Sequence, residues 1–352
     1  MKNTFKYLNT LLFVIFLASC SQTPFPELGQ TTNKYNLSTE SLLADAGHVQ
    51  SIDSLYNLGV DGYFTGADDV KIYYKYFLQD KPEKGAIVIS DGRTEAAVKY
   101  KEVIFDLFNN GYSVYIHDHR GQGFSGRMVA DADMGYIDEF RYYVDDLKYF
   151  YDNLITPHNH KNIFLLAHSM GGAIGVTFLE DYPGYFNAAA FSSPMLGFGF
   201  ANCFMVGLLT GDKPKYAMGH TNYDDGIVSF DENTLTGSEV RYNRMNRVFE
   251  EGPEARLGGA TYQWANKSCK QFDVISDNIS KIETPLILFS AGDEEIVSAS
   301  AHNDFIDELN SSGKDAKAYL VDGAKHELLI EKDEIRIAVL TKILDFYAVY
   351  ER

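Results

Sequence analysis

Basic residues are scarce in this chain of 352 residues. It has 31 Lys and Arg against 49 Asp and Glu, which gives a formal net charge of −18 at pH 7. The sequence contains no basic stripe, so it lacks the electrostatic footprint of a nucleic-acid-binding protein. For the same reason we expect no electrostatic attraction to anionic lipid, and any attachment to a membrane needs another source.

Cysteine is also scarce, with three residues in the whole chain. No pair of Cys or His residues has the spacing of a zinc site. The run His117-Asp118-His119 closes a predicted strand, where we expect structural hydrogen bonding rather than a metal. Cys203 and Cys269 could form a disulfide in an oxidising compartment or remain as two buried thiols, and the sequence leaves both open. We expect neither a metal nor an organic cofactor.

The apolar run near the amino terminus, residues 11–16, is too short to span a bilayer. It is followed by Leu17-Ala18-Ser19-Cys20, which resembles a bacterial lipobox. The resemblance implies a signal peptide over residues 1–19, acylation of Cys20 and a tether over residues 20–48. We therefore expect a lipid-anchored lipoprotein of the bacterial cell envelope, on its periplasmic or surface face. An uncleaved anchor and an ordinary signal peptide are the alternatives.

A candidate nucleophile follows the apolar residues 163–166, which lead directly into Ala167-His168-Ser169-Met170-Gly171-Gly172. A strand that ends in small-x-Ser-x-Gly and turns at once into a helix is typical of the nucleophile elbow of α/β-hydrolases. The tight turn requires small residues two before and two after the serine, and Ala167 and Gly171 meet that demand. The pattern predicts Ser169 as the nucleophile; an ordinary buried strand-to-helix turn is the alternative.

Candidate acid and base residues follow in the order that this fold uses, serine, then acid, then histidine. The buried-strand pattern of residues 285–291 leads into Gly292-Asp293-Glu294-Glu295-Ile296-Val297. The acid generally precedes one variable residue and then a Val/Ile pair, which selects Glu294, with Asp293 as the alternative acid. A second short strand, residues 318–321, leads into a loop that contains His326.

These residue types suit acyl transfer. Ser169 becomes a nucleophile when His326 takes its proton, and His326 later donates that proton to the leaving alcohol. A buried carboxylate fixes the tautomer of the histidine. The oxyanion needs two N–H donors, which we assign to the backbone of Met170 and of Arg93, the latter in the loop after the strand at residues 85–90. The alternative for Arg93 is a surface cation paired with Glu95.

The chain alternates strands and helices from residue 85 to residue 192, which predicts a mostly parallel sheet flanked by helices. A hairpin signal over residues 63–77 precedes it. We divide the chain into a first core part (residues 49–194), a cap or lid insertion (195–284) and a second core part (285–352). The insertion begins with apolar residues up to Leu209, which form either the wall of an acyl-chain channel or packing of the cap itself.

Three longer motifs carry a family resemblance. Residues 118–127, Asp-His-Arg-Gly-Gln-Gly-Phe-Ser-Gly-Arg, resemble a turn of the bacterial lysophospholipase and monoacylglycerol lipase branch of the α/β-hydrolases. Residues 92–100 resemble the oxyanion segment of its lysophospholipase members, and residues 257–264 resemble their cap signature. The resemblance implies an α/β-hydrolase fold with an inserted cap and a serine hydrolase of single-chain acyl lipids, lysophospholipids first and monoacylglycerols second.

Several alternatives stay open at this stage. A general carboxylesterase or thioesterase would use the same residues, and a non-catalytic lipid-binding surface lipoprotein would share the fold. Arg241, Arg244 and Arg247 recur at three-residue spacing on a predicted helix. They could bind a phosphate headgroup, although an exposed, ion-paired helix face is the favoured interpretation. The sequence does not determine the oligomeric state.

Overall fold

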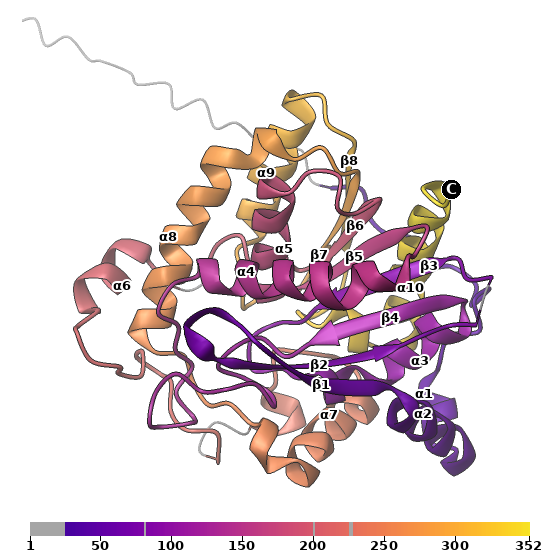
Figure 1. The fold of residues 1–352 in the computed structure, drawn as a ribbon, viewed down its shortest axis with the longest axis horizontal. Coiled ribbons are helices and arrows are strands. Elements are labelled where there is room, and N and C mark those ends of the chain that lie inside the picture. Colours follow the sequence, from indigo (N-terminus) through magenta and orange to yellow (C-terminus); the bar gives the residue numbers. More distant parts are fainter. Residues whose placement is uncertain (1–24, 81, 200, 225–227) are drawn as a thin grey trace, which may run out of the picture.

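The computed structural model describes residues 25–352 except 81, 200 and 225–227. Its centre is an eight-stranded sheet in the order β1-β2-β4-β3-β5-β6-β7-β8 (Figure 1). β1 and β2 form an antiparallel hairpin, β2 pairs antiparallel with β4, and the remaining neighbours are parallel. The strands are β1 (Val60–Thr65), β2 (Lys71–Phe77), β3 (Gly85–Ser90), β4 (Tyr112–His117), β5 (Ile163–His168), β6 (Ala188–Ser192), β7 (Leu286–Ala291) and β8 (Ala316–Val321).

Helices cover both faces of this sheet. They are α1 (Glu40–Leu43), α2 (Ala46–Leu58), α3 (Lys101–Asn109), α4 (Arg141–Phe150), α5 (Met170–Asp181), α6 (Cys203–Leu209), α7 (Glu239–Glu251), α8 (Tyr262–Asn278), α9 (Ala299–Ser311) and α10 (Asp333–Val349). α4, α5, α8 and α9 pack on one face, and α2, α3 and α10 pack on the other. The predicted mostly parallel sheet flanked by helices is confirmed.

The central strands are apolar along their whole length because both of their faces are buried. In β3, Ala86 and Val88 belong to the core on the α5 side, whereas Ile87 and Ile89 belong to the core on the α3 side. Successive side chains of a strand point to opposite faces. The sheet therefore has two separate cores, and the loops after its parallel strands meet at one edge.

The segment before α1 is packed on the core where the sequence predicted a tether. Leu28 N–H donates to Leu320 O over 2.7 Å, and Leu320 N–H donates to Pro26 O over 3.0 Å. Leu37 is fully buried, and Ser38 donates through both its N–H and its hydroxyl to Asp106. Any tether must therefore end before residue 26. The predicted signal peptide and Cys20 lie outside the described residues.

The segment between β6 and β7 contains α6, α7 and α8. A disulfide joins Cys203 at the start of α6 to Cys269 in α8, which selects one of the two states that the sequence left open. α7 differs at Arg241 from the exposed, ion-paired face that its arginines predicted, whereas Arg244 is half-buried and Arg247 is exposed. Arg241 is buried and pairs with Glu102 and Asp333, both at 2.9 Å. It therefore links the insertion to the core and is not free to meet a lipid headgroup.

The sequence predicted structural hydrogen bonding for the run His117-Asp118-His119. The structure shows it for Asp118 and His119 but not for His117. Asp118 accepts hydrogen bonds from Ala97 N–H at 2.6 Å and Phe124 N–H at 2.7 Å. His119 Nε2 lies 3.3 Å from the hydroxyl of Ser90. His117 is buried with no hydrogen bond to its ring from any described residue, and burial lowers its pKa well below the usual value.

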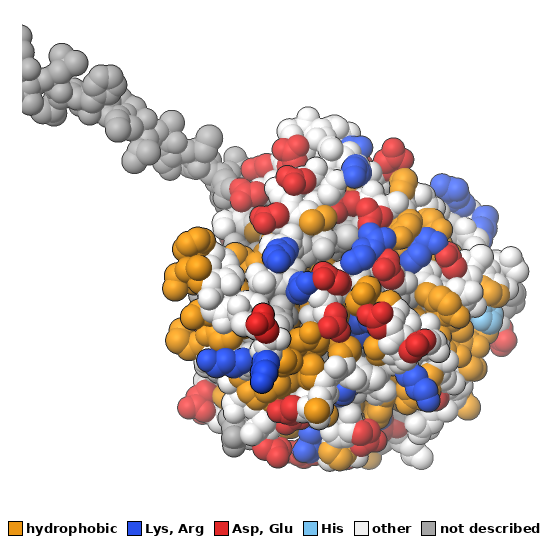
Figure 2. Space-filling model, turned by 60° about the vertical axis from the view of Figure 1, so that its left-hand side comes forward, with side chains coloured by type: hydrophobic (Ala, Val, Ile, Leu, Met, Phe, Trp, Pro, Cys, Tyr) orange, Lys and Arg blue, Asp and Glu red, His pale blue; other side chains and the backbone are white. Residues whose placement is uncertain are grey.

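The surface agrees with the acidic composition. On the face that Figure 2 shows, basic side chains are scattered among acidic ones and form no stripe. Within the part of the chain that the structure describes, no helix is long and apolar enough to cross a membrane.

Candidate active site

Ser169 occupies the sharp turn between β5 and α5. Its backbone has φ 50° and ψ −120°, a conformation that L-residues rarely adopt and that persists only where the surroundings enforce it. Ser169 N–H donates to Ser192 O at 3.1 Å, and Ser169 O accepts from Met195 N–H at 2.8 Å. A Cβ on Gly171 would lie 2.1 Å from Ser90 O, so only glycine fits there. The local geometry is that of the predicted elbow.

The loops after β7 and β8 bring Glu294 and His326 together. The two Glu294 carboxylate oxygens lie 2.9 and 3.0 Å from His326 Nδ1, and both side chains are almost completely buried. Asp293 and Glu295, the neighbours of Glu294, are exposed. The structure therefore places Glu294 on the histidine and leaves Asp293 facing solvent.

Hydrogen bonds maintain Glu294 in its ionised form. Burial by itself would raise the pKa of this carboxyl, but the hydrogen bond and charge of His326 oppose it. Ile296 N–H at 2.8 Å and Val297 N–H at 3.2 Å also donate to Glu294 Oε1. Together they lower the pKa of Glu294 to about 2. The carboxylate is thus a permanent acceptor for the Nδ1–H of His326, which leaves Nε2 of the neutral ring as a base.

His326 lies at the serine turn. Its ring centroid is 4.9 Å from that of His168, the residue immediately before Ser169. His168 Nδ1 lies 2.9 Å from Ser192 O, so the ring donates to a carbonyl at the end of the neighbouring strand β6. The loop after β8 therefore places the Glu294–His326 pair beside the end of β5, where Ser169 stands.

The loop after β3 lies against the same turn. A Cβ on Gly92 would lie 3.1 Å from Ser169 Cβ, so the chain passes directly beside the serine. Gly92 N–H already donates to Glu95 Oε2 at 2.6 Å. Among the described residues, neither Met170 N–H nor Arg93 N–H has an acceptor. These two groups are the predicted oxyanion donors, and both are free to bind a ligand oxygen.

A buried polar network connects this loop to the histidine loop. Glu95 accepts from Gly92 N–H and from the hydroxyl of Tyr100, both at 2.6 Å. Lys99 donates to Glu95 and, over 2.6 Å, to Glu327, the residue after His326. One ammonium thereby ties together the two loops that flank Ser169. From the sequence, Glu95 is considered only as a partner of Arg93, and Lys99 and Glu327 have no role, because nothing in the spacing shows that Lys99 reaches Glu327.

The charges in this network hold one another in place. Burial alone would lower the pKa of Lys99 and raise that of Glu95. The charges of Glu327 and Glu95 outweigh burial for Lys99 and raise its pKa, and the charge of Lys99, with His168, outweighs burial for Glu95 and lowers its pKa. Burial and the charge of Glu95 raise the pKa of Glu327 to about 7. Glu95 is therefore the ionised partner, and Glu327 is the carboxyl that protonates first.

Glu95, His168 and Glu327 also have the composition of a metal site, with their ligand atoms within 4.8 Å of one another. The ammonium of Lys99 already contacts both carboxylates. A metal ion there would have to share the space with this cation. The donor set is therefore better explained as a compensated ionic network.

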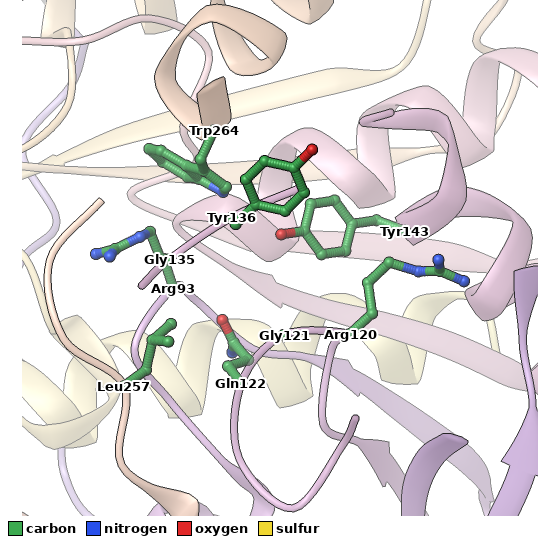
Figure 3. A pocket seen from close by; sticks show the side chains of 9 residues that line it. All are labelled: Arg93, Arg120, Gly121, Gln122, Gly135, Tyr136, Tyr143, Leu257 and Trp264. Atoms are coloured by element: carbon green, nitrogen blue, oxygen red, sulfur yellow. The ribbon is translucent and has the colours of Figure 1, made fainter. Parts of the chain in front are cut away.

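Arg93 does not form the surface pair with Glu95 that was the alternative to its oxyanion role. Its guanidinium lies 5.1 Å from the ring centre of Trp264 and donates from Nη2 to Gly258 O at 2.7 Å (Figure 3). Trp264 and Gly258 both belong to the segment between β6 and β7. Burial lowers the pKa of Arg93 to about 10, so the group remains a cation at neutral pH. Its side chain therefore contacts the inserted segment while its backbone lies beside Ser169.

The apolar start of the insertion divides into two parts. Met195 and Leu196 are buried, and Met195 N–H bonds to Ser169 O, so this part lies at the serine turn. α6 agrees with the cap-packing interpretation only at Val206, which is buried in the same core as Met195 and Leu196. Phe204 and Leu208 are 73% and 65% exposed, so they form neither a channel wall nor a cap core.

Comparisons with known proteins agree with this geometry. Residues 81–333 match the family described as serine aminopeptidase, S33. The chain is 35% identical over 296 residues to lysophospholipase L2 of Escherichia coli K12. The aligned region covers 81% of this chain and 86% of that protein. It is 26% identical over 279 residues to a monoglyceride lipase homolog of monkeypox virus, covering 78% and 94%.

A solved structure shows the same fold. A soluble variant of monoglyceride lipase from Saccharomyces cerevisiae, in complex with a substrate analog, superposes with a TM-score of 0.66 at 17% identity. The match covers 84% of this chain and 96% of that chain. At this identity the likeness shows the α/β-hydrolase fold alone.

The choice of acid can be tested by Glu294→Gln, with Asp293→Asn as the matched control. The amide cannot stabilise a histidine cation and favours the wrong tautomer, so we expect kcat to fall by roughly 10⁴. Asp293→Asn should leave kcat close to that of the wild type, because its side chain faces solvent. Steady-state kinetics on a chromogenic ester measures both. A large loss in Asp293→Asn with an active Glu294→Gln would contradict the assignment.

Lys99→Met tests the network. It leaves two buried carboxylates without their cation, so we expect the free energy of unfolding to fall by about 3–5 kcal/mol at pH 8. Without the ammonium, burial raises the pKa of Glu95 above its unfolded value. The variant then loses stability as the pH rises through the raised pKa of Glu95. The difference in the free energy of unfolding between wild type and variant should therefore be smaller at pH 5 than at pH 8.

Lys101→Met is the control for this measurement, because its pair with Asp53 is partly exposed and should contribute about 0–1 kcal/mol. Urea denaturation at the two pH values gives the free energies. Equal effects of the two substitutions, or a deficit at pH 5 as large as that at pH 8, would show that Lys99 does not compensate buried charge.

Proposed function

Because the chain belongs to the serine aminopeptidase S33 family and is an ester hydrolase, we propose that it hydrolyses single-chain acyl lipids, with lysophospholipids as the preferred class. The observation that carries the chemistry is the Glu294–His326 pair placed at the strained Ser169 turn. The substrate class is supported by the similarity to lysophospholipase L2 of E. coli over most of both chains.

The reaction proceeds in two halves. His326 Nε2 takes the proton of the Ser169 hydroxyl while Oγ attacks the ester carbonyl, and Glu294 stabilises the imidazolium. The oxyanion accepts hydrogen bonds from Met170 N–H and Arg93 N–H. Collapse of this intermediate breaks the bond to the glycerol oxygen, which takes the proton from His326. Water then attacks the acyl-Ser169 ester by the same route and releases the fatty acid.

A second candidate activity is monoacylglycerol hydrolysis, which the similarity to the monkeypox virus monoglyceride lipase homolog favours. A general carboxylesterase or thioesterase would use the same three side chains. A non-catalytic lipid-binding lipoprotein would show no activity that depends on Ser169.

The substrate class can be tested with the full-length protein and its Ser169→Ala variant. Each is incubated with lysophosphatidylethanolamine, monoolein, a diacyl phospholipid and a short ester, and released acid is measured by mass spectrometry. We expect release from the lysophospholipid, a spared diacyl lipid and a loss of several powers of ten in the variant, because triad members act as a unit.

Each of the other outcomes of this assay would assign the protein a different activity. Turnover of monoolein alone would make it a monoacylglycerol lipase, and cleavage of the short ester alone would make it a general esterase. Release that persists in Ser169→Ala would contradict the mechanism. A folded protein that releases nothing would favour the non-catalytic lipoprotein.

We also propose that acylated Cys20 anchors the enzyme to the bacterial cell envelope. Two or more acyl chains give stable attachment, since each buried CH₂ contributes about 0.8 kcal/mol. The acidic surface gives no competing attraction to anionic lipid. Cys20→Ala is expected to move the protein from the membrane fraction to the soluble fraction, as followed by immunoblotting. An unchanged membrane fraction would refute the anchor.

A further inference from the structure

Arg93 is half-buried and, unlike the buried arginines, has no counter-ion among the described residues. Arg120 pairs with Asp146, Arg241 with Glu102, and Arg336 with Asp106, at 2.7–2.9 Å. The Arg93 guanidinium has neutral acceptors only, Gly258 O at 2.7 Å and Thr94 Oγ1 at 2.9 Å. Its Nε atom is buried with no partner among the described residues.

A desolvated cation without a carboxylate is unfavourable unless something anionic compensates it. Tyr143 and Tyr216 lie near enough to Arg93 to influence its pKa, and no carboxylate of the described residues does so. The Tyr216 hydroxyl is itself buried with no hydrogen-bond partner in the described part of the chain. Two unpartnered donors, one of them a cation, therefore lie close together at the junction of core and inserted segment.

The position of Arg93 in the loop beside Ser169 suggests which ligand its guanidinium binds. Arg93 follows Gly92, whose backbone lies beside Ser169, and its side chain extends to Gly258 and Trp264 of the inserted segment. In a lysophospholipid, a glycerol unit of three carbons separates the acyl ester from the phosphate. A guanidinium binds phosphate through paired N–H donors. If the ester carbonyl binds the backbone N–H of Arg93, the phosphate on the other end of the glycerol is within reach of the side chain of the same residue.

We propose that Arg93, assisted by Tyr216, binds the phosphate of the lysophospholipid and thereby selects it over a neutral monoacylglycerol. This inference rests on the proposed function, since the phosphate belongs to its substrate. It replaces the headgroup role considered for Arg241, Arg244 and Arg247, of which Arg241 is occupied by Glu102 and Asp333. The side chain of Arg93 then determines specificity, whereas its backbone N–H serves catalysis.

The test compares Arg93→Gln, Arg93→Lys and Tyr216→Phe with the wild type. Lysophosphatidylethanolamine and a monoacylglycerol with the same acyl chain are the two substrates. We expect the ratio of their kcat/KM values to fall roughly tenfold or more in Arg93→Gln, mainly through KM for the phospholipid. Arg93→Lys should recover part of the ratio, and Tyr216→Phe should lower it less. A general loss of structure would reduce both substrates alike and leave the ratio unchanged.

A second readout does not require phospholipid turnover. sn-Glycerol 3-phosphate should inhibit hydrolysis of a short chromogenic ester competitively in the wild type and at least several-fold more weakly in Arg93→Gln. An unchanged substrate ratio together with equal inhibition of both proteins would overturn the Arg93 site while leaving the proposed function intact. A wild-type enzyme that is inhibited by glycerol 3-phosphate yet does not cleave lysophospholipid would retain the phosphate site and overturn the substrate.

Discussion

The backbone turn at Ser169 is the constraint on which the site depends. A serine at φ 50° has to be enforced by its surroundings, and here the enforcement comes from both sides of β5. The backbone of Ser90 at the end of β3 passes so close to Gly171 that no side chain fits, while Ser192 and Met195 bond to the serine's own peptide groups. The cost of such strain is of the order of 1–3 kcal/mol, and the strained turn holds the serine at the edge where the loops after β3, β7 and β8 converge.

Convergence alone does not fix the relative positions of these loops. Glu95 binds the backbone of the oxyanion loop, Glu327 follows the catalytic histidine candidate, and Lys99 lies between the two carboxylates. Ion pairs of this kind contribute little net stability compared with apolar packing, but an arrangement that breaks them leaves a buried charge uncompensated and is strongly disfavoured. We interpret the network as the element that sets the distance between oxyanion donors and base. The same loop carries Arg93, so its placement also sets the direction of the guanidinium that faces the inserted segment.

Local patterns were sufficient to predict much of this arrangement. The small residues around Ser169 follow from the requirements of a tight turn, and the order of Glu294 and His326 behind buried strands is the one that α/β-hydrolases use. The Val/Ile rule selected Glu294 over Asp293, and the structure places Glu294 on His326.

Interactions between distant parts of the chain were not predictable in this way. Lys99 and Glu327 are 228 residues apart in the sequence, and Arg241 reaches Glu102 over 139. The three-residue spacing of the α7 arginines describes a helix face but not the carboxylates that cover it. Residues 26–38 read as a polar tether because their partners, Leu320 and Asp106, belong to the core. Likewise, nothing near Arg93 in the sequence shows that it turns away from Glu95 toward Trp264.

The central claim is that Ser169 is a nucleophile activated by His326. Covalent labelling with a fluorophosphonate, followed by peptide mass mapping, tests it most directly, because the phosphonylated residue is identified without any assumption about substrate. The account predicts one adduct, on the peptide that contains Ser169, and its loss in a folded His326→Ala variant. An adduct on another residue, or a folded wild-type protein that takes up no label, would contradict the account.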